Sequence, residues 1–113
     1  MAVKTSLKLI AEEIGTAIRG YAARCGWGQD DIAITGTFDP TTDRITVYLA
    51  SDRRVDERQW YKDVLGLLRQ QFLDSPGLVS RIGIIVKNVE SLDSAYHDLL
   101  VADDEIDLTE YLD

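Results

Sequence analysis

The feature that most constrains this fold is a run of β-branched residues, Ile-Gly-Ile-Ile-Val, at positions 82–86. The run is too short for a helix, and the turn-forming residues Ser75-Pro76-Gly77 and Asn88 lie on either side of it. We therefore expect a buried strand over Ile82–Val86. Successive side chains in a strand point to opposite faces, so Ile85 needs cover on the second face of the sheet. We therefore expect either the C-terminal segment or a second chain to cover this strand.

A long first helix is predicted near the N-terminus. Apolar residues recur at intervals of three and four from Leu7 to Tyr21, which is the spacing of one buried helix face. Thr5 or Ser6 provides a cap, and the helix is expected to end near Cys25. Glycines interrupt this helix at positions 15 and 20, which indicates that another backbone packs close there.

A β-hairpin is predicted next, because apolar and polar residues alternate over 32–38 and again over 44–49. The turn between them is Asp39–Asp43, in which Pro40 presets the backbone and the Asp39 carboxylate accepts a backbone hydrogen bond. The alternation predicts one polar face for this hairpin.

The second helix has the clearest start signal in the chain. Asp56 is an N-cap candidate, and Gln59 stands three residues later, as in a capping box. Val55 and Trp60 occupy the positions of a hydrophobic staple. The helix is predicted to end at Asp74-Ser75-Pro76-Gly77. A third, shorter helix is expected over 91–101.

The element order is therefore α-β-β-α-β-α, in an α+β fold class. We expect a small antiparallel or mixed sheet, formed by the hairpin and one further strand and covered on one face by two long helices. The length indicates a single domain over residues 1–102. Residues 103–113 form an acidic C-terminal segment that either packs on the domain or binds a partner.

Charge is distributed unevenly along the chain. The net charge is −8, and residues 88–113 hold nine acidic residues and no Lys or Arg. Lys87 is the last basic residue. Such asymmetry is typical of an interaction segment, and it argues against nucleic acid as the main partner, because phosphate binding requires cations.

Two sets of candidate binding residues follow. The first combines acidic and apolar side chains that suit a basic, apolar groove on a protein partner; it consists of Asp103, Asp104, Glu105, Ile106, Asp107, Leu108, Tyr111 and Leu112. The alternative set is a basic patch with neighbouring aromatic residues at the start of the second helix, suited to RNA; it consists of Arg53, Arg54, Arg58 and Lys62. Asp52, Asp56, Glu57 and Asp63 neutralise this patch, so a solvated face with local ion pairs is favoured over RNA binding there.

No sequence pattern indicates catalysis or a cofactor. The single histidine, His97, lies four residues after Asp93, a spacing that suits a base and its orienting carboxylate, but no nucleophile motif accompanies it. The acidic run Asp103–Asp107 lacks the glycine and the alternating acids of a calcium-binding loop. The glycines around Trp27 match no nucleotide fingerprint. We expect no catalytic, metal or cofactor residues.

The sequence therefore predicts a non-enzymatic protein–protein interaction or adaptor domain, chaperone-like and homodimeric. Its size and acidity resemble those of small dimeric secretion chaperones, although the element order differs from theirs. The alternative is a small RNA- or ribosome-associated domain, by analogy with small α+β folds of the KH type. An enzyme using His97 is the third hypothesis. The single cysteine, together with the absence of an apolar run of membrane-spanning length, indicates a cytoplasmic protein.

Overall fold

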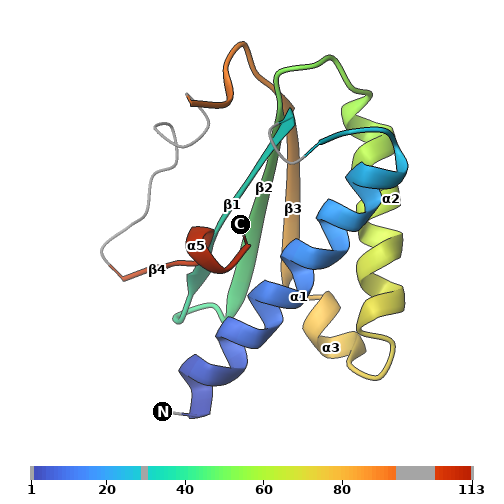
Figure 1. Cartoon of the computed structure of the whole chain (residues 1–113). Helices are drawn as coiled ribbons and strands as arrows, with labels where there is room; N and C mark the ends of the chain where they lie inside the picture. Colours follow the sequence, from blue (N-terminus) through green and yellow to red (C-terminus); the bar gives the residue numbers. More distant parts are fainter. Residues whose placement is uncertain (1, 29–30, 94–103, 113) are drawn as a thin grey trace.

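The computed structural model describes residues 2–28, 31–93 and 104–112 (Figure 1). It has an α+β fold with a four-stranded mixed sheet. Its elements in chain order are α1 (Ala2–Arg24), β1 (Ile32–Asp39), β2 (Arg44–Ser51), α2 (Glu57–Gln71), α3 (Pro76–Val79), β3 (Ile82–Asn88), β4 (Ile106–Asp107) and α5 (Thr109–Leu112). Figure 1 shows α1 and α2 on the same side of the sheet.

The strand order across the sheet is β3-β2-β1-β4. β1 pairs antiparallel with both β2 and β4, and β2 pairs parallel with β3. Parallel neighbours need a long crossover connection, and α2 with the short α3 provides it between β2 and β3. The register sets Val47 beside Ile84, so the apolar residues of the two strands share the face under the helices.

The first helix begins earlier than the sequence predicted. It runs from Ala2, so Thr5 and Ser6 lie inside it and the predicted cap is wrong. Its end agrees with the prediction within one residue. Gly26 has a φ of 85°, and the backbone N–H of Trp27 donates to the carbonyl of Ala22 at 2.9 Å. A left-handed glycine with this bond is the usual way to satisfy the last carbonyls of a helix.

The second helix begins as predicted, although only half of the capping box forms. The Asp56 carboxylate accepts the backbone N–H of Gln59 at 3.1 Å. The Gln59 side chain donates instead to the Asp63 carboxylate, at 2.9 Å. Val55 and Trp60 both pack against the core, where the staple positions place them. The helix ends at Gln71, and the predicted breaker Ser75-Pro76-Gly77 leads into α3.

The predicted hairpin forms, and the Asp39 carboxylate accepts the backbone N–H of Thr41 at 2.9 Å, as expected. Its predicted polar face is solvated on β2, where Arg44 is exposed and Thr46 is half-buried, but not on β1. Thr35 is 2% exposed and Thr37 is 3% exposed. β1 lies between two other strands, so larger neighbours such as Tyr48, the cross-strand partner of Thr35, shield these small side chains. The predicted alternation is therefore confirmed on β2, and the prediction of a solvated face is wrong on β1.

The end of the chain, whose structure the sequence left open, adds β4 and α5 to the edge of β1 (Figure 1). The described part of the C-terminal segment, residues 104–112, therefore lies at the opposite edge of the sheet from β3 and does not cover it. The helix predicted over 91–101 falls largely outside the described residues.

Candidate protein-interaction surface

Hydrogen bonds to the backbone of β1 hold the C-terminal segment against the sheet. The N–H of Leu108 donates to the carbonyl of Gly36 at 2.9 Å, and the N–H of Gly36 donates to Oγ1 of Thr109 at 3.4 Å. The Asp107 carboxylate accepts the N–H of Thr109 at 2.9 Å and so begins α5. Leu108 and Leu112 are both fully buried in the core.

Helix α1 holds α5 from the other side. The Arg19 guanidinium donates to the carbonyl of Leu112, which satisfies a free acceptor at the end of the chain's last turn. Gly15 lies against the same carbonyl, and a Cβ at this position would be only 2.9 Å from its carbon atom. The close packing expected at a helix glycine is therefore confirmed at Gly15. Gly20 has nothing within 4 Å of an added Cβ, so the expectation is wrong there.

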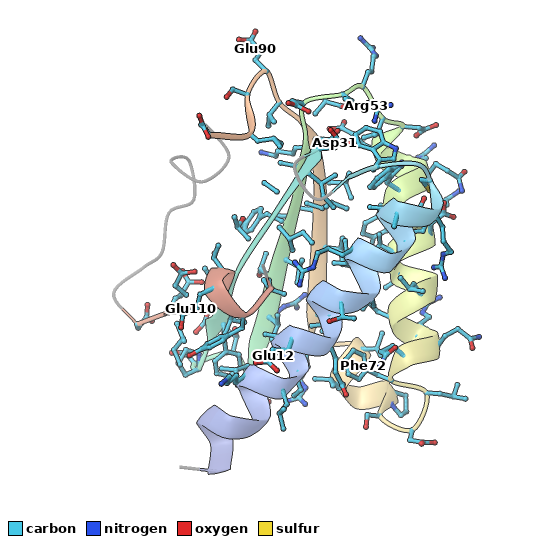
Figure 2. All side chains as sticks on the ribbon, in the orientation of Figure 1. Glu12, Asp31, Arg53, Phe72, Glu90 and Glu110 are labelled. Atoms are coloured by element: carbon cyan, nitrogen blue, oxygen red, sulfur yellow. The ribbon has the colours of Figure 1, made fainter. Side chains whose placement is uncertain are left out.

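Three carboxylates are exposed among the described residues of this segment, 104–112. We refer to Asp104, Asp107 and Glu110 together as the acidic edge. Tyr111 is half-buried beside them, with the Lys8 ammonium 5.8 Å from its ring centre. A hydrogen bond with Glu110 raises the pKa of the Tyr111 hydroxyl, and the negative charges of Glu110 and Glu12 raise it further. Figure 2 labels Glu12 on α1 and Glu110 on α5, two elements that pack together.

The structure divides the predicted acidic set into surface and core residues. Leu108 and Leu112 fill the core of this chain, and their side chains offer no surface to a partner. Ile106 is half-buried against the core, and Glu105 accepts a hydrogen bond from Oγ1 of Thr37 at 3.0 Å. Asp103 lies outside the described residues. Among residues 104–112, the surface left for a partner is the acidic edge with Tyr111.

The alternative basic patch is partly used by the chain itself. The Arg53 guanidinium stacks on the Trp27 ring at 4.2 Å and lies 3.5 Å from the Asp31 carboxylate. Figure 2 shows Arg53 and Asp31 next to each other at one end of the molecule. Arg53 nevertheless stays exposed, as do Arg54, Arg58 and Lys62. Arg58 and Lys62 are four residues apart on α2 and therefore share one helix face.

Sequence reasoning missed the aromatic cluster below Arg53. The Trp60 ring meets Tyr21 and Trp27 edge to face, with centroids 5.1 and 5.2 Å away. The Tyr21 hydroxyl donates to the Asp63 carboxylate at 2.7 Å, and burial together with this bond raises the Tyr21 pKa. The two tryptophans were visible in the sequence as separate helix signals, but no local pattern relates them across 33 positions.

A cavity of about 350 Å³ adjoins this cluster, between α1 and the chain after Trp27. Its described lining is largely apolar, and Arg19, the one charged residue among those lining residues, is bonded to the Leu112 carbonyl. The cavity could therefore enclose an apolar group, but it has few polar groups with which to recognise a specific ligand. Cys25, just after the end of α1, is exposed and forms no disulfide. His97, the basis of the enzyme hypothesis, lies outside the described residues.

Comparisons with known proteins give no relative. No protein-family model matches the chain, and neither the curated proteins nor the solved structures contain a match. Within the described ranges, no helix is long and apolar enough to cross a membrane, and no three potential ligand side chains gather as a metal site would require. Function is therefore inferred from the chain's own surfaces.

Proposed function

We propose that this chain is a non-enzymatic protein–protein interaction domain, adaptor or chaperone-like, that acts as a homodimer and binds a basic partner through the acidic edge. The observation that carries the proposal is that one short segment contains both buried core residues and exposed carboxylates. Leu108 and Leu112 are buried in the core, while Asp104, Asp107 and Glu110 point to solvent. A fixed backbone that presents several like charges requires little ordering when a partner binds.

The electrostatics of the whole chain support a basic partner. The net charge of −8 repels acidic molecules, and an exposed cluster of carboxylates increases the association rate of basic ones. Tyr111 adds a half-buried aromatic ring within this surface. Tyrosine is enriched at protein interfaces because it combines a large apolar area with a polar tip.

The experiment neutralises the acidic edge without disturbing the fold. In the variant Asp104→Asn/Asp107→Asn/Glu110→Gln, the amide at position 107 keeps the oxygen that accepts the Thr109 N–H. Removing residues 103–113 is unsuitable, because the deletion would also remove two core leucines. Immobilised wild type and variant are compared for captured proteins, and the affinity of the main captured protein is then measured.

The matched control is Glu13→Gln/Asp52→Asn/Asp74→Asn, which changes the net charge equally at exposed acids elsewhere. We expect the acidic-edge variant to weaken the affinity by roughly tenfold, since three exposed charge pairs each contribute a fraction of a kcal/mol. The control should bind within about twofold of wild type. Equal binding by both variants would refute the proposal.

The RNA-associated alternative has one observation in its favour, the exposure of Arg53, Arg54, Arg58 and Lys62. It requires RNA binding that weakens steeply with salt and disappears in Arg58→Glu/Lys62→Glu. The same measurement on the acidic-edge variant separates the two proposals, because neutralising those carboxylates should not weaken RNA binding.

A further inference from the structure

β3 lies at the edge of the sheet and turns one side of its backbone away from β2. The N–H of Ile45 donates to the carbonyl of Arg81 at 2.9 Å, so the odd-numbered residues of this strand bond toward β2. Alternate residues of a strand point their backbone groups to opposite sides. The N–H and C=O groups of Ile82, Ile84 and Val86 therefore point outward, and within the described residues no strand pairs with that side.

Helix α2 places apolar side chains above this free edge. The N–H of Asn88, the next outward group, donates to the Glu57 carboxylate at 3.0 Å. The flank of α2 that carries Glu57 therefore lies toward the outer side of β3. Tyr61 and Leu65 follow Glu57 at intervals of four and share its flank. Tyr61 is 42% exposed, and Leu65 is half-buried.

The face of β3 away from the helices is also apolar beside the edge. Ile85 pairs with Tyr48 of β2, and both side chains are half-buried on that face. Apolar surface thus lies both above and below the same free strand edge. Native edge strands are usually protected by an inward charge, a proline or a bulge. The stretch Ile82–Val86 contains no charge and no proline.

We infer that β3 pairs antiparallel with β3 of a second copy of this chain, which joins two four-stranded sheets into one. This inference rests on the homodimer in the proposed function and specifies its interface. A lone extended peptide could pair with β3 and cover Ile85, but it would leave Tyr61 exposed in the helix layer. A second copy supplies a strand and the flank of α2 at once.

Charge selects the register of this pairing. A two-fold axis at Ile84 would set Arg81 directly opposite Lys87 of the partner subunit, and like charges in that position are destabilising. An axis at Ile85 sets Lys87 opposite Gly83 of the partner subunit and brings the two Ile85 side chains together. The structure therefore favours the Ile85 register, in which Glu57 ends the pairing at Asn88.

The same axis aligns the two α2 helices. From Asn88, beside Glu57, to Ile85 is about 10 Å along the strand, which corresponds to roughly seven helix residues. The axis then lies level with about residue 64 of α2. Tyr61 faces Leu65 of the partner subunit in this arrangement, so both apolar layers meet across one two-fold axis.

The test is a disulfide placed on the axis, in a Cys25→Ser background that removes the native exposed thiol. In Ile85→Cys, oxidation should give mostly covalent dimer, because directly opposite residues in a non-hydrogen-bonded pair have Cα atoms about 4.5 Å apart. The matched control is Tyr48→Cys, on the same face and similarly half-buried. Its symmetry mate is three strand spacings away, roughly 14 Å, which a disulfide cannot bridge.

A second measurement uses charge at the same position. Ile85→Lys and Ile85→Glu should each sediment as monomers and give the circular dichroism spectrum of the folded wild type. A mixture of the two variants should sediment as a dimer. Equal crosslinking of Ile85→Cys and Tyr48→Cys would overturn the inference. Preferential crosslinking between Gly83→Cys and Ile85→Cys chains would also overturn it, because these positions are opposite each other only when the axis lies at Ile84. A wild type that is monomeric at every concentration would overturn it as well.

These outcomes are separable from those for the acidic edge. Loss of partner binding in a variant that remains dimeric concerns the proposed function. A monomeric wild type that still binds its partner through the acidic edge would refute the β3 pairing alone.

Discussion

At the scale of single residues, two glycines inside α1 have opposite surroundings. Gly15 faces the carbonyl of Leu112, where a Cβ would collide with backbone, and Gly20 faces open space. The sequence predicted close packing at both, because a glycine inside a helix is otherwise unfavourable. Only the position of α5, which composition does not fix, distinguishes them.

Replacing each glycine by alanine should therefore change stability in opposite directions. We expect Gly15→Ala to lower the free energy of unfolding by about 1–3 kcal/mol through overpacking. Gly20→Ala should raise it by about 0.5–1 kcal/mol, since alanine favours the helix. Urea denaturation of both variants measures this. A stabilising Gly15→Ala would show that α5 does not pack on α1.

Tyr21 makes stability depend on pH in the alkaline range. Its pKa is raised in the folded state, first by burial and then by the hydrogen bond with Asp63. Above the ordinary tyrosine pKa of about 10, the unfolded chain therefore loses this proton while the folded chain keeps it. The free energy of unfolding should fall as pH rises through and above that value.

The variant Tyr21→Phe removes this contribution. Its free energy of unfolding should be lower than that of wild type near neutral pH, by about 1 kcal/mol for the lost hydrogen bond. It should then decline less steeply above pH ~10. Denaturation series at several alkaline pH values provide the measurement, with Tyr48→Phe as the control. Parallel pH profiles for wild type and Tyr21→Phe would contradict this account.

At the scale of elements, β4 and α5 are the part that the sequence described least. Their residues mix acids with spaced leucines, a composition compatible with a free tail or a packed turn. In the structure this segment packs on the domain, because Gly36 leaves room for the Leu112 side chain over β1. A Cβ at position 36 would lie 2.6 Å from Leu112 Cδ1. That complementarity joins positions 76 residues apart and has no local signal.

The same substitution at two leucines tests this packing. Leu112→Ala should cost about 2–5 kcal/mol of unfolding free energy, as for other fully buried leucines. Leu73→Ala, at a side chain that is 72% exposed, should change it by less than about 0.5 kcal/mol. Chemical denaturation compares the two. Similar small effects would mean that α5 contributes nothing to the core.

At the scale of the whole molecule, the sequence anticipated the α+β class, the hairpin and the strand at 82–86, each of which has a local pattern. The start of α2 followed from Asp56. What it could not supply was contact between distant segments. The Arg53 guanidinium stacks on Trp27 while it stays exposed, and the pairing of β4 with β1 places part of a predicted interaction segment against the core.

These long-range contacts also explain why the charge asymmetry matters. The acidic residues after Lys87 are not simply a solubilising end, because Leu108 and Leu112 are buried beneath some of them. The central claim is therefore that the acidic edge is part of the folded domain and holds its carboxylates in fixed positions.

Native-state hydrogen exchange at the Leu108 amide tests that claim most directly, since this N–H is bonded to the carbonyl of Gly36. We expect it to exchange as slowly as the amides of β1, because opening it requires the chain's core to open. Exchange at the rate of an unfolded peptide, while the amides of β1 stay protected, would show that the C-terminal segment is a tail and would contradict the account.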